Sequence, residues 1–218
     1  MIVRFLSMLW IVPLVLAACA ALPAVVRDVC ASAGRYGWFA AGMGVQLALS
    51  VALHGRMAWL RTFAHEAAHS MVALLLLGHI REFSATASAG GHVRYDGVRF
   101  GTLFVALAPY CLPYMAYASA LVAALVDGRY RPAADAVTGF ALMFHLVCFA
   151  CQTRTGQPDI RDSGCLRSLL FIAGFGVVNV SVVVRSVACG LWQAVCLQAA
   201  DMWQALQGMA HTLLAHLA

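Results

Sequence analysis

Lysine is absent from this sequence, and glutamate occurs only twice, at Glu66 and Glu82, in 218 residues. Charged residues make up 11% of the chain and hydrophobic residues 63%, and the mean hydropathy is +0.84. A typical soluble domain has about 25% charged residues. The shortage of charge therefore excludes an ordinary soluble protein and predicts an integral membrane protein with several membrane-spanning segments.

The basic residues give a formal net charge of +5, and all 14 of them are arginine. They are distributed among the polar links and do not form a basic run with interleaved aromatic residues. Such a stripe is the signature of a nucleic-acid surface, so we expect no nucleic-acid partner. We expect a lipid bilayer to surround most of the protein surface.

Most of the eight cysteines lie in apolar segments, where a free thiol behaves as a small hydrophobic side chain. Cys148 and Cys151 form a CxxC pair. No second CxxC accompanies it, and a structural zinc site would require one. The cysteines therefore predict neither a disulfide framework nor a zinc ribbon.

Long apolar runs predict an all-α polytopic membrane protein with about six transmembrane helices. The C-terminal segment, 191–218, has polar residues at near-helical spacing and is expected to form either a seventh membrane helix or an interfacial amphipathic helix. Pro109 and Pro113 should kink the fourth span. The six expected spans are 2–26, 37–53, 57–77, 103–126, 136–151 and 166–184.

All 218 residues are expected to form one membrane-embedded domain, with a core at about 57–184. The N-terminal span could also be read as a signal peptide, because Leu16-Ala17-Ala18-Cys19 resembles a bacterial lipoprotein cleavage box. The apolar run continues past Cys19, so we favour an uncleaved span.

The third expected span contains the sequence His65-Glu66-Ala67-Ala68-His69, an HExxH motif. Two histidines four residues apart on a helix are separated by about 40° of rotation, so both rings can reach one ion. Glu66 is then placed to take a proton from a water molecule that a zinc ion activates. The alternative is a pair of buried histidines with ordinary hydrogen bonds, but ionisable groups in an apolar segment favour a functional site.

A small β-hairpin is expected directly after this helix. The segment from His79 to Thr86 and the segment from His92 to Tyr95 flank Gly90-Gly91, and a Gly-Gly pair between two short strands is typical of a hairpin turn. Unpaired strand edges cannot face lipid, so the hairpin should lie at the interface or against the protein. His79 and His92 are possible additional ligands, although solvated histidines are the simpler interpretation.

A zinc site of this type needs a third protein ligand, and the two glutamates restrict the choice. Glu82 lies on the expected hairpin, and no histidine follows HEAAH at the spacing of a third ligand. Aspartate is therefore the expected ligand type. We favour Asp159, which follows a helix-breaking Pro158 after the fifth span, with Asp162 as the alternative and His145 as a further option.

HEAAH in an apolar segment, followed by HIREFSAT and a Gly-Gly pair, resembles the site-2 protease family of intramembrane zinc metalloproteases. The later sequence GQPDIRDSG retains the Pro, Asp and Gly of that family's NxxPxxxLDG motif but lacks its Asn and its LDG sequence. The resemblance covers about Leu60 to Gly164. It implies a divergent zinc metalloendopeptidase in the bacterial inner (plasma) membrane, whose substrates are transmembrane or membrane-associated proteins.

The residues predict the same chemistry: His65, His69 and Asp159 (or Asp162) as metal ligands for Zn²⁺, and Glu66 as the catalytic base. Two other interpretations remain open at this level. One is a membrane metal-ion transporter, which would need a second metal-binding span where this sequence offers only His145. The other is a non-catalytic metal-binding membrane protein.

Overall fold

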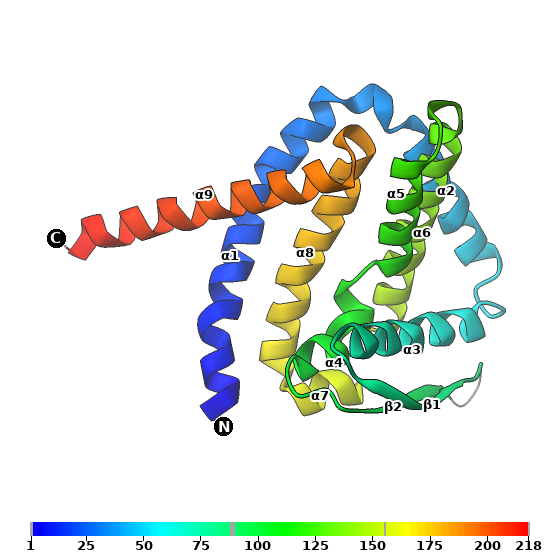
Figure 1. The fold of residues 1–218 in the computed structure, drawn as a ribbon, viewed down its shortest axis with the longest axis horizontal. Coiled ribbons are helices and arrows are strands. Elements are labelled where there is room, and N and C mark those ends of the chain that lie inside the picture. The colour runs from blue at the N-terminus through cyan, green and yellow to red at the C-terminus, as the bar shows by residue number, and fades with distance from the viewer. Residues whose placement is uncertain (1, 88–89, 155, 218) are drawn as a thin grey trace.

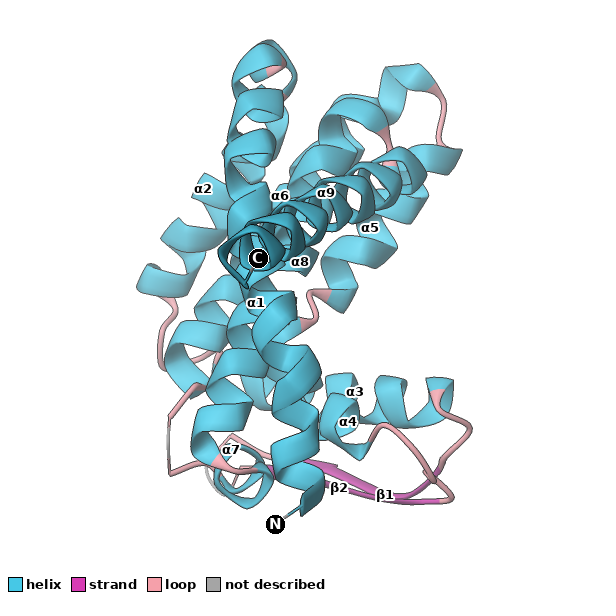
Figure 2. Cartoon of the chain, turned by 90° about the vertical axis from the view of Figure 1, so that its left-hand side faces the viewer, coloured by secondary structure: helices cyan, strands magenta, loops and turns pink. Residues whose placement is uncertain are grey.

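The computed structural model describes residues 2–87, 90–154 and 156–217. They form helices and one two-stranded antiparallel sheet (Figures 1 and 2). Short 3-10 turns occur at Ala33–Arg35 and Gly128–Tyr130. The elements are α1 (Ile2–Ala31), α2 (Gly37–Ala52), α3 (Ala58–Leu75), β1 (His79–Ala85), β2 (Gly91–Asp96), α4 (Thr102–Cys111), α5 (Tyr114–Leu125), α6 (Arg131–Gln152), α7 (Pro158–Ser163), α8 (Cys165–Cys189) and α9 (Leu191–Leu217).

Three helical segments within the described residues are long and apolar enough to cross a membrane. They are Leu6–Ala31 in α1, Gly128–Gln152 with α6, and Cys165–Cys189, which is α8. The bent pair α4 and α5 would make a fourth. The apolar helices are compatible with a membrane protein, but the expected number of about six spans is not confirmed.

The expected spans at 37–53 and 57–77 account for much of this difference. The segment expected at 37–53 forms α2, which is apolar but only 16 residues long. The segment expected at 57–77 forms α3, whose hydropathy is lowered by Arg61, His65, Glu66 and His69. Figure 1 shows α3 lying across the ends of α5 and α6 instead of running alongside them. The residues of the HExxH motif therefore lie on a helix at one end of the bundle.

The fourth expected span is broken by its prolines, as the sequence predicts. α4 and α5 are bent by 76° at the break between them. Leu112 is extended there, with φ −109° and ψ 101°, because the ring of Pro113 disfavours the helical conformation at the residue before it. The bend lets α4 pack beneath α3, where Ala68 and Val72 of α3 meet Val105 of α4 in one buried cluster.

Buried residues of four elements fix the position of the short helix α7. Its Ile160 is fully buried and packs with Ile11 of α1, Leu107 of α4 and Phe171 of α8. The hydroxyl of Ser168 on α8 donates a hydrogen bond to the carbonyl oxygen of Ile160 at 3.1 Å. The sequence predicted only a polar link with broken helices in this region, so α7 is an addition to the expected fold.

The β-hairpin after the HExxH helix is confirmed. β1 and β2 pair antiparallel, with Phe83 opposite Val93 and Ser84 opposite His92; residues 88–89 of the turn lie outside the described part. The hairpin packs along α3, where the indole Nε1 of Trp59 donates to the carbonyl oxygen of Ala85 at 3.1 Å. It lies at the same end of the molecule as α7 (Figure 2).

The C-terminal segment is one continuous helix, as both expectations for it required. It follows Gly190, whose φ of +83° changes the direction of the chain after α8. α9 is not among the helices that meet the criteria for a membrane span, because glutamine, histidine and aspartate interrupt its apolar residues. Its second half projects from the body of the molecule (Figure 1).

Candidate metal centre

His65 and His69 lie one helical turn apart on α3, with ring centroids 4.9 Å apart. His69 is buried, and its Nδ1 lies 2.8 Å from the carbonyl oxygen of Val105. A carbonyl oxygen can only accept a hydrogen bond, so Nδ1 must carry the proton when this bond forms. The lone pair of Nε2, on the other side of the ring, is then available to a metal ion, which is the usual arrangement of a metal-binding histidine.

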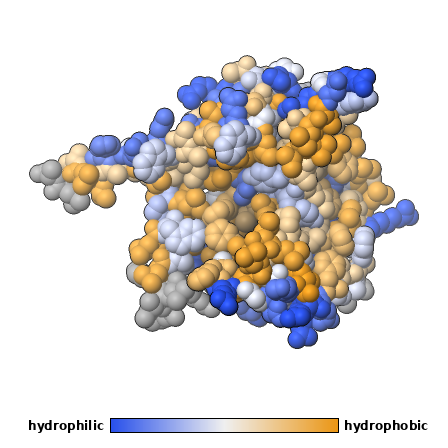
Figure 3. Space-filling view, viewed as in Figure 1, coloured by the Kyte–Doolittle hydropathy of each residue, from blue (hydrophilic) through white to orange (hydrophobic). Residues whose placement is uncertain are grey.

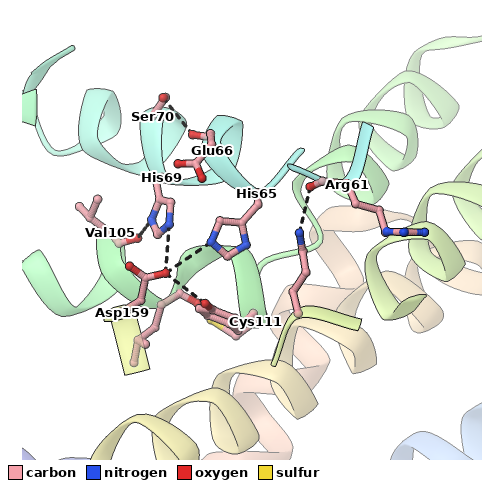
Figure 4. Close-up of polar contacts among 11 residues, drawn as sticks. Arg61, His65, Glu66, His69, Ser70, Val105, Cys111 and Asp159 are labelled. Atoms are coloured by element: carbon pink, nitrogen blue, oxygen red, sulfur yellow. Dashed lines mark hydrogen bonds and ion pairs between the residues drawn. The ribbon is translucent and has the colours of Figure 1, made fainter. Parts of the chain in front are cut away.

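Asp159 brings a carboxylate to both rings from α7. Its Oδ2 lies 3.4 Å from Nε2 of His65 and 3.5 Å from Nε2 of His69 (Figure 4). The hydroxyl of Tyr110 on α4 donates to the same oxygen at 3.0 Å. Burial alone would raise the pKa of Asp159, but the adjacent imidazoles of His65 and His69 hold that pKa well below the usual range. The carboxylate is therefore charged at neutral pH.

The donor atoms of these three residues fit a metal ion. They all lie within 4.8 Å of one another. Within residues 2–87, 90–154 and 156–217, this is the one cluster of three or more His, Cys, Asp or Glu side chains that could hold a metal ion. Ligands at 2.0–2.2 Å from a tetrahedral ion are separated by roughly 3.3 Å. The two histidine-aspartate distances are close to that value and long for a hydrogen bond. The structure therefore contains a possible metal-binding triad, and the metal's identity is a separate question.

Glu66 lies between the two histidines on the same helix (Figure 4) and is 6% exposed. Burial raises the pKa of Glu66, which the neighbouring His65 and His69 partly offset. A carboxylate with a raised pKa is a stronger base than a solvated one. Glu66 is not one of the three residues of the possible metal-binding triad. A residue that transfers protons beside a metal is expected to lie next to the ligands without binding the ion itself.

A cavity of about 330 Å³ gives access to this cluster. Its walls come from four elements: α3 with His65, Glu66 and His69, α4 with Ala106, α7 with Pro158 and Asp159, and the strand β2. β2 contributes Gly91, His92, Val93 and Tyr95. The hairpin therefore forms one wall of the cavity that His65, His69 and Asp159 also line.

The other residues considered as ligands lie outside the triad. Asp162 pairs with Arg161 at 3.0 Å. His92 lies on the cavity wall, but its Nε2 contacts Oε1 of Glu82 at 2.9 Å, and His79 lies on the exposed part of the hairpin, 3.9 Å from Asp96. His145, on α6, lines a small space of about 20 Å³ that His65 also lines, and it is not part of the triad.

Sequence reasoning missed Tyr110 and the carbonyl group of Val105, both of which come from α4. A tyrosine hydroxyl in an apolar segment needs a hydrogen-bond partner, and this requirement was the available signal for Tyr110. No side chain signals the role of a backbone carbonyl group such as that of Val105. The α4 helix approaches α3 only because of the break at Leu112 and Pro113, so both contacts depend on the tertiary fold.

No family model matches this chain, and neither a curated protein nor a solved structure does. A functional interpretation therefore depends on the residues of the site and on the resemblance of its motifs.

Proposed function

We propose that this protein is an intramembrane zinc metallopeptidase that hydrolyses peptide bonds of membrane or membrane-associated proteins. The observation that carries the proposal is the convergence of Asp159 on the two histidines of an HExxH helix, with Glu66 beside them. Two imidazoles and one carboxylate are a ligand set of catalytic zinc sites, which leave one position open. The resemblance to site-2 proteases supports the same class, with the bacterial inner membrane as its location.

Zinc at this site would supply a Lewis acid, which polarises a carbonyl group and lowers the pKa of water towards ~7. The protein supplies the groups that hold and move protons. Glu66 takes the proton from the attacking water and transfers it to the departing amine. Its burial keeps bulk water away from this transfer and strengthens its basicity. Tyr110 and the carbonyl group of Val105 orient Asp159 and His69, respectively.

The hairpin provides the means to hold a substrate in an extended form. β2 lines the cavity, and β1 is its only neighbouring strand within residues 2–87, 90–154 and 156–217, so the other edge of β2 is unpaired there. A peptide segment that leaves its own helix needs partners for its backbone groups, and strand addition provides them. We therefore propose that the scissile segment pairs with β2 before it reaches the metal.

A metal-ion transporter is less well supported by the arrangement of ligands. Transport across a membrane requires further binding groups along a path, and the triad is the only such group among the described residues. The helices α3 and α7, which carry the triad, also lie with the hairpin at one end of the molecule (Figure 1).

The test is cleavage of a co-expressed library of single-span substrates, with zinc content measured on the same preparations. Glu66→Gln should abolish cleavage and leave bound zinc unchanged, whereas Asp159→Asn should lose both. Asp162→Asn is the matched control, because it removes a nearby exposed carboxylate that is not grouped with the ligands, and it should keep both.

If Glu66→Gln cleaves as well as the wild type, the proposed mechanism is wrong. If no variant or wild-type preparation cleaves any substrate but zinc binds through Asp159, the non-catalytic interpretation replaces it. Metal uptake into proteoliposomes that depends on Asp159 would favour the transporter.

A further inference from the structure

The helix α9 leaves the body of the molecule in an unusual direction. It begins at Leu191, directly after α8, and crosses α1 and α8 instead of running parallel to them (Figure 1). Its first half packs against the bundle, where Ala194 and Gln198 are buried. Every residue from 210 to 216 is exposed. A helix of 27 residues therefore extends sideways, with its outer half unsupported by the rest of the protein.

Ion pairs around the buried Arg185 mark the level at which α9 crosses the bundle. Arg185 of α8 is 2% exposed and forms ion pairs with Asp28 of α1 and Asp201 of α9. Its guanidinium group also donates to the side-chain carbonyl of Gln198 at 3.1 Å. Charged groups are costly in the hydrocarbon core of a bilayer, so this cluster indicates the boundary at which α1 and α8 leave it. α9 starts from that boundary.

The exposed surface of α9 is divided into two faces. At about 100° of rotation per residue, most of the exposed apolar side chains fall on one stripe, and the exposed glutamines and His211 fall on another. Leu197, Thr212 and His216 lie outside these two stripes. Trp192 and Trp203 of the apolar stripe are 79% and 62% exposed. The remaining exposed members of the apolar stripe include Val195, Leu213 and Leu214, and the polar stripe consists of Gln193, Gln204, Gln207 and His211.

The two faces are oriented consistently with respect to the bundle. In Figure 3 the hydrophilic residues of α9 lie along the upper edge of the projecting helix, and hydrophobic residues lie below them, on the side of the apolar body. The metal centre, the hairpin and α7 lie at the other end of the molecule (Figure 1). The apolar stripe thus faces the region that lipid acyl chains occupy around α1 and α8.

We propose that α9 is a membrane-surface helix that lies in the headgroup region on the side of the bilayer away from the metal centre. Its apolar stripe contacts acyl chains, and its tryptophans lie at the interfacial level that this residue prefers. The helix has no Arg or Lys, and its one acidic residue is paired with Arg185. Contact with lipid is therefore apolar in origin and does not require anionic lipids, unlike that of a basic amphipathic helix.

A second copy of the chain is the competing occupant of this stripe. Paired helices need a narrow apolar seam and flanking charges that fix the partner. The stripe on α9 is about 100° wide and has no flanking charges. These features favour a continuous lipid surface over another helix.

Photo-crosslinking in phosphatidylcholine nanodiscs tests the proposal on the full-length chain. The crosslinking residue p-benzoylphenylalanine is placed at position 203 on the apolar stripe or, as the matched control, at position 204 on the polar stripe. Mass spectrometry should find lipid adducts at position 203 and none at position 204. Adding anionic lipid should leave the yield at position 203 unchanged.

Three other outcomes would overturn the proposal. Lipid adducts at both positions would indicate a membrane-crossing helix, adducts between two chains would indicate a dimerisation arm, and the absence of adducts at both would indicate a helix in water.

Cleavage by proteinase K provides an independent measurement on folded, monodisperse preparations. The helix should become sensitive in the triple variant Trp203→Ser, Leu213→Ser, Leu214→Ser and stay protected in the control Gln204→Ser, Gln207→Ser, His211→Ser.

Discussion

Gly91 at the start of β2 lies in direct contact with the side chain of Glu66 on α3. A Cβ atom on residue 91 would lie 2.6 Å from Cγ and 2.8 Å from Oε1 of Glu66. It would also lie 2.8 Å from the carbonyl oxygen of Ser84 on the paired strand. The absence of a side chain on Gly91 therefore lets the hairpin approach the proposed catalytic base, and the hairpin in turn limits where that carboxylate can lie.

The variant Gly91→Ala should lose activity while it retains zinc. The added methyl group must displace either the Glu66 side chain or the hairpin, and a misplacement of about 1 Å can reduce a rate by about 100-fold. No atom of the proposed ligands His65, His69 and Asp159 is among the three that the methyl group would meet first. Peptide cleavage and zinc content, measured on one preparation, separate the two effects.

Gly44→Ala is the matched control for this change, since a Cβ atom at residue 44 meets nothing within 4 Å. Its cleavage rate should equal that of the wild type. Full activity in Gly91→Ala would show that the position of Glu66 against the hairpin does not matter for the reaction.

Tyr110→Phe should weaken zinc binding by about 10- to 100-fold, the usual effect of losing a hydrogen bond to a metal ligand. The hydroxyl of Tyr110 donates to Oδ2 of Asp159, the same oxygen that faces both histidines. Competition titration against a zinc chelator measures the change. At saturating zinc the variant should recover most of its activity, because Tyr110 acts by positioning Asp159.

Tyr117→Phe is the corresponding control in the neighbouring helix α5, where the hydroxyl of Tyr117 donates to Asn179 at 2.7 Å. Its zinc affinity should match that of the wild type. Equal zinc affinities for Tyr110→Phe and Tyr117→Phe would contradict a role for Tyr110 at the metal centre.

The residues of the candidate site could be predicted from the sequence more completely than the number of membrane spans. The spacing of His65 and His69 depends only on helical geometry, and the shortage of glutamate directed attention to Asp159. The structure places that residue with the two histidines, while the roles of all three as zinc ligands stay predictions. The hairpin was predictable because Gly-Gly and alternating residues are local signals.

The number of spans and the direction of α3 could not be obtained in this way. The expected third span combined an apolar run with the polar residues of HEAAH, and α3 is not among the helices apolar enough to cross a membrane. Its direction across the end of the bundle depends on its packing and cannot be read from hydropathy (Figure 1). The contact of Tyr110 with Asp159 joins residues 49 positions apart. It depends on the bend between α4 and α5, whose existence the prolines predicted but whose angle they did not.

Gly139→Ala should destabilise the bundle without changing the chemistry of the site. α2 and α6 approach so closely at Gly139 that a Cβ atom there would lie 2.0 Å from the carbonyl oxygen of Phe39. Close helix packing in membranes commonly relies on small residues of this kind, and overpacking costs about 1–3 kcal/mol. Gly176→Ala on α8 is the control, because a Cβ atom there meets nothing within 4 Å.

Thermal unfolding in detergent should therefore show a lower Tm for Gly139→Ala and an unchanged Tm for Gly176→Ala. Zinc content per folded molecule should stay constant in both. An equal Tm for the two variants would mean that α2 and α6 separate at little cost, contrary to the packing at Gly42 and Gly139.

Zinc removal should loosen α7 more than any other helix of the bundle. The triad connects α3 to α7 across about 90 residues of chain, since Asp159 on α7 and His69 on α3 contribute ligand atoms to one group. An ion that binds only the folded state stabilises it by about 4 kcal/mol when its concentration is 1,000 times Kd. Chelation should therefore lower the Tm and raise amide hydrogen exchange in α7, while exchange in α2 and α6, which pack against each other, stays the same.

The variant Asp159→Asn separates this effect from a direct action of the chelator on the protein. It should already exchange rapidly in α7, and the chelator should change neither its Tm nor its exchange rates. Asp162→Asn should respond to the chelator as the wild type does, because its carboxylate pairs with Arg161 and lies outside the triad. If chelation lowers the Tm of Asp159→Asn by as much as that of the wild type, zinc stabilises the protein through other residues and the triad is not its site.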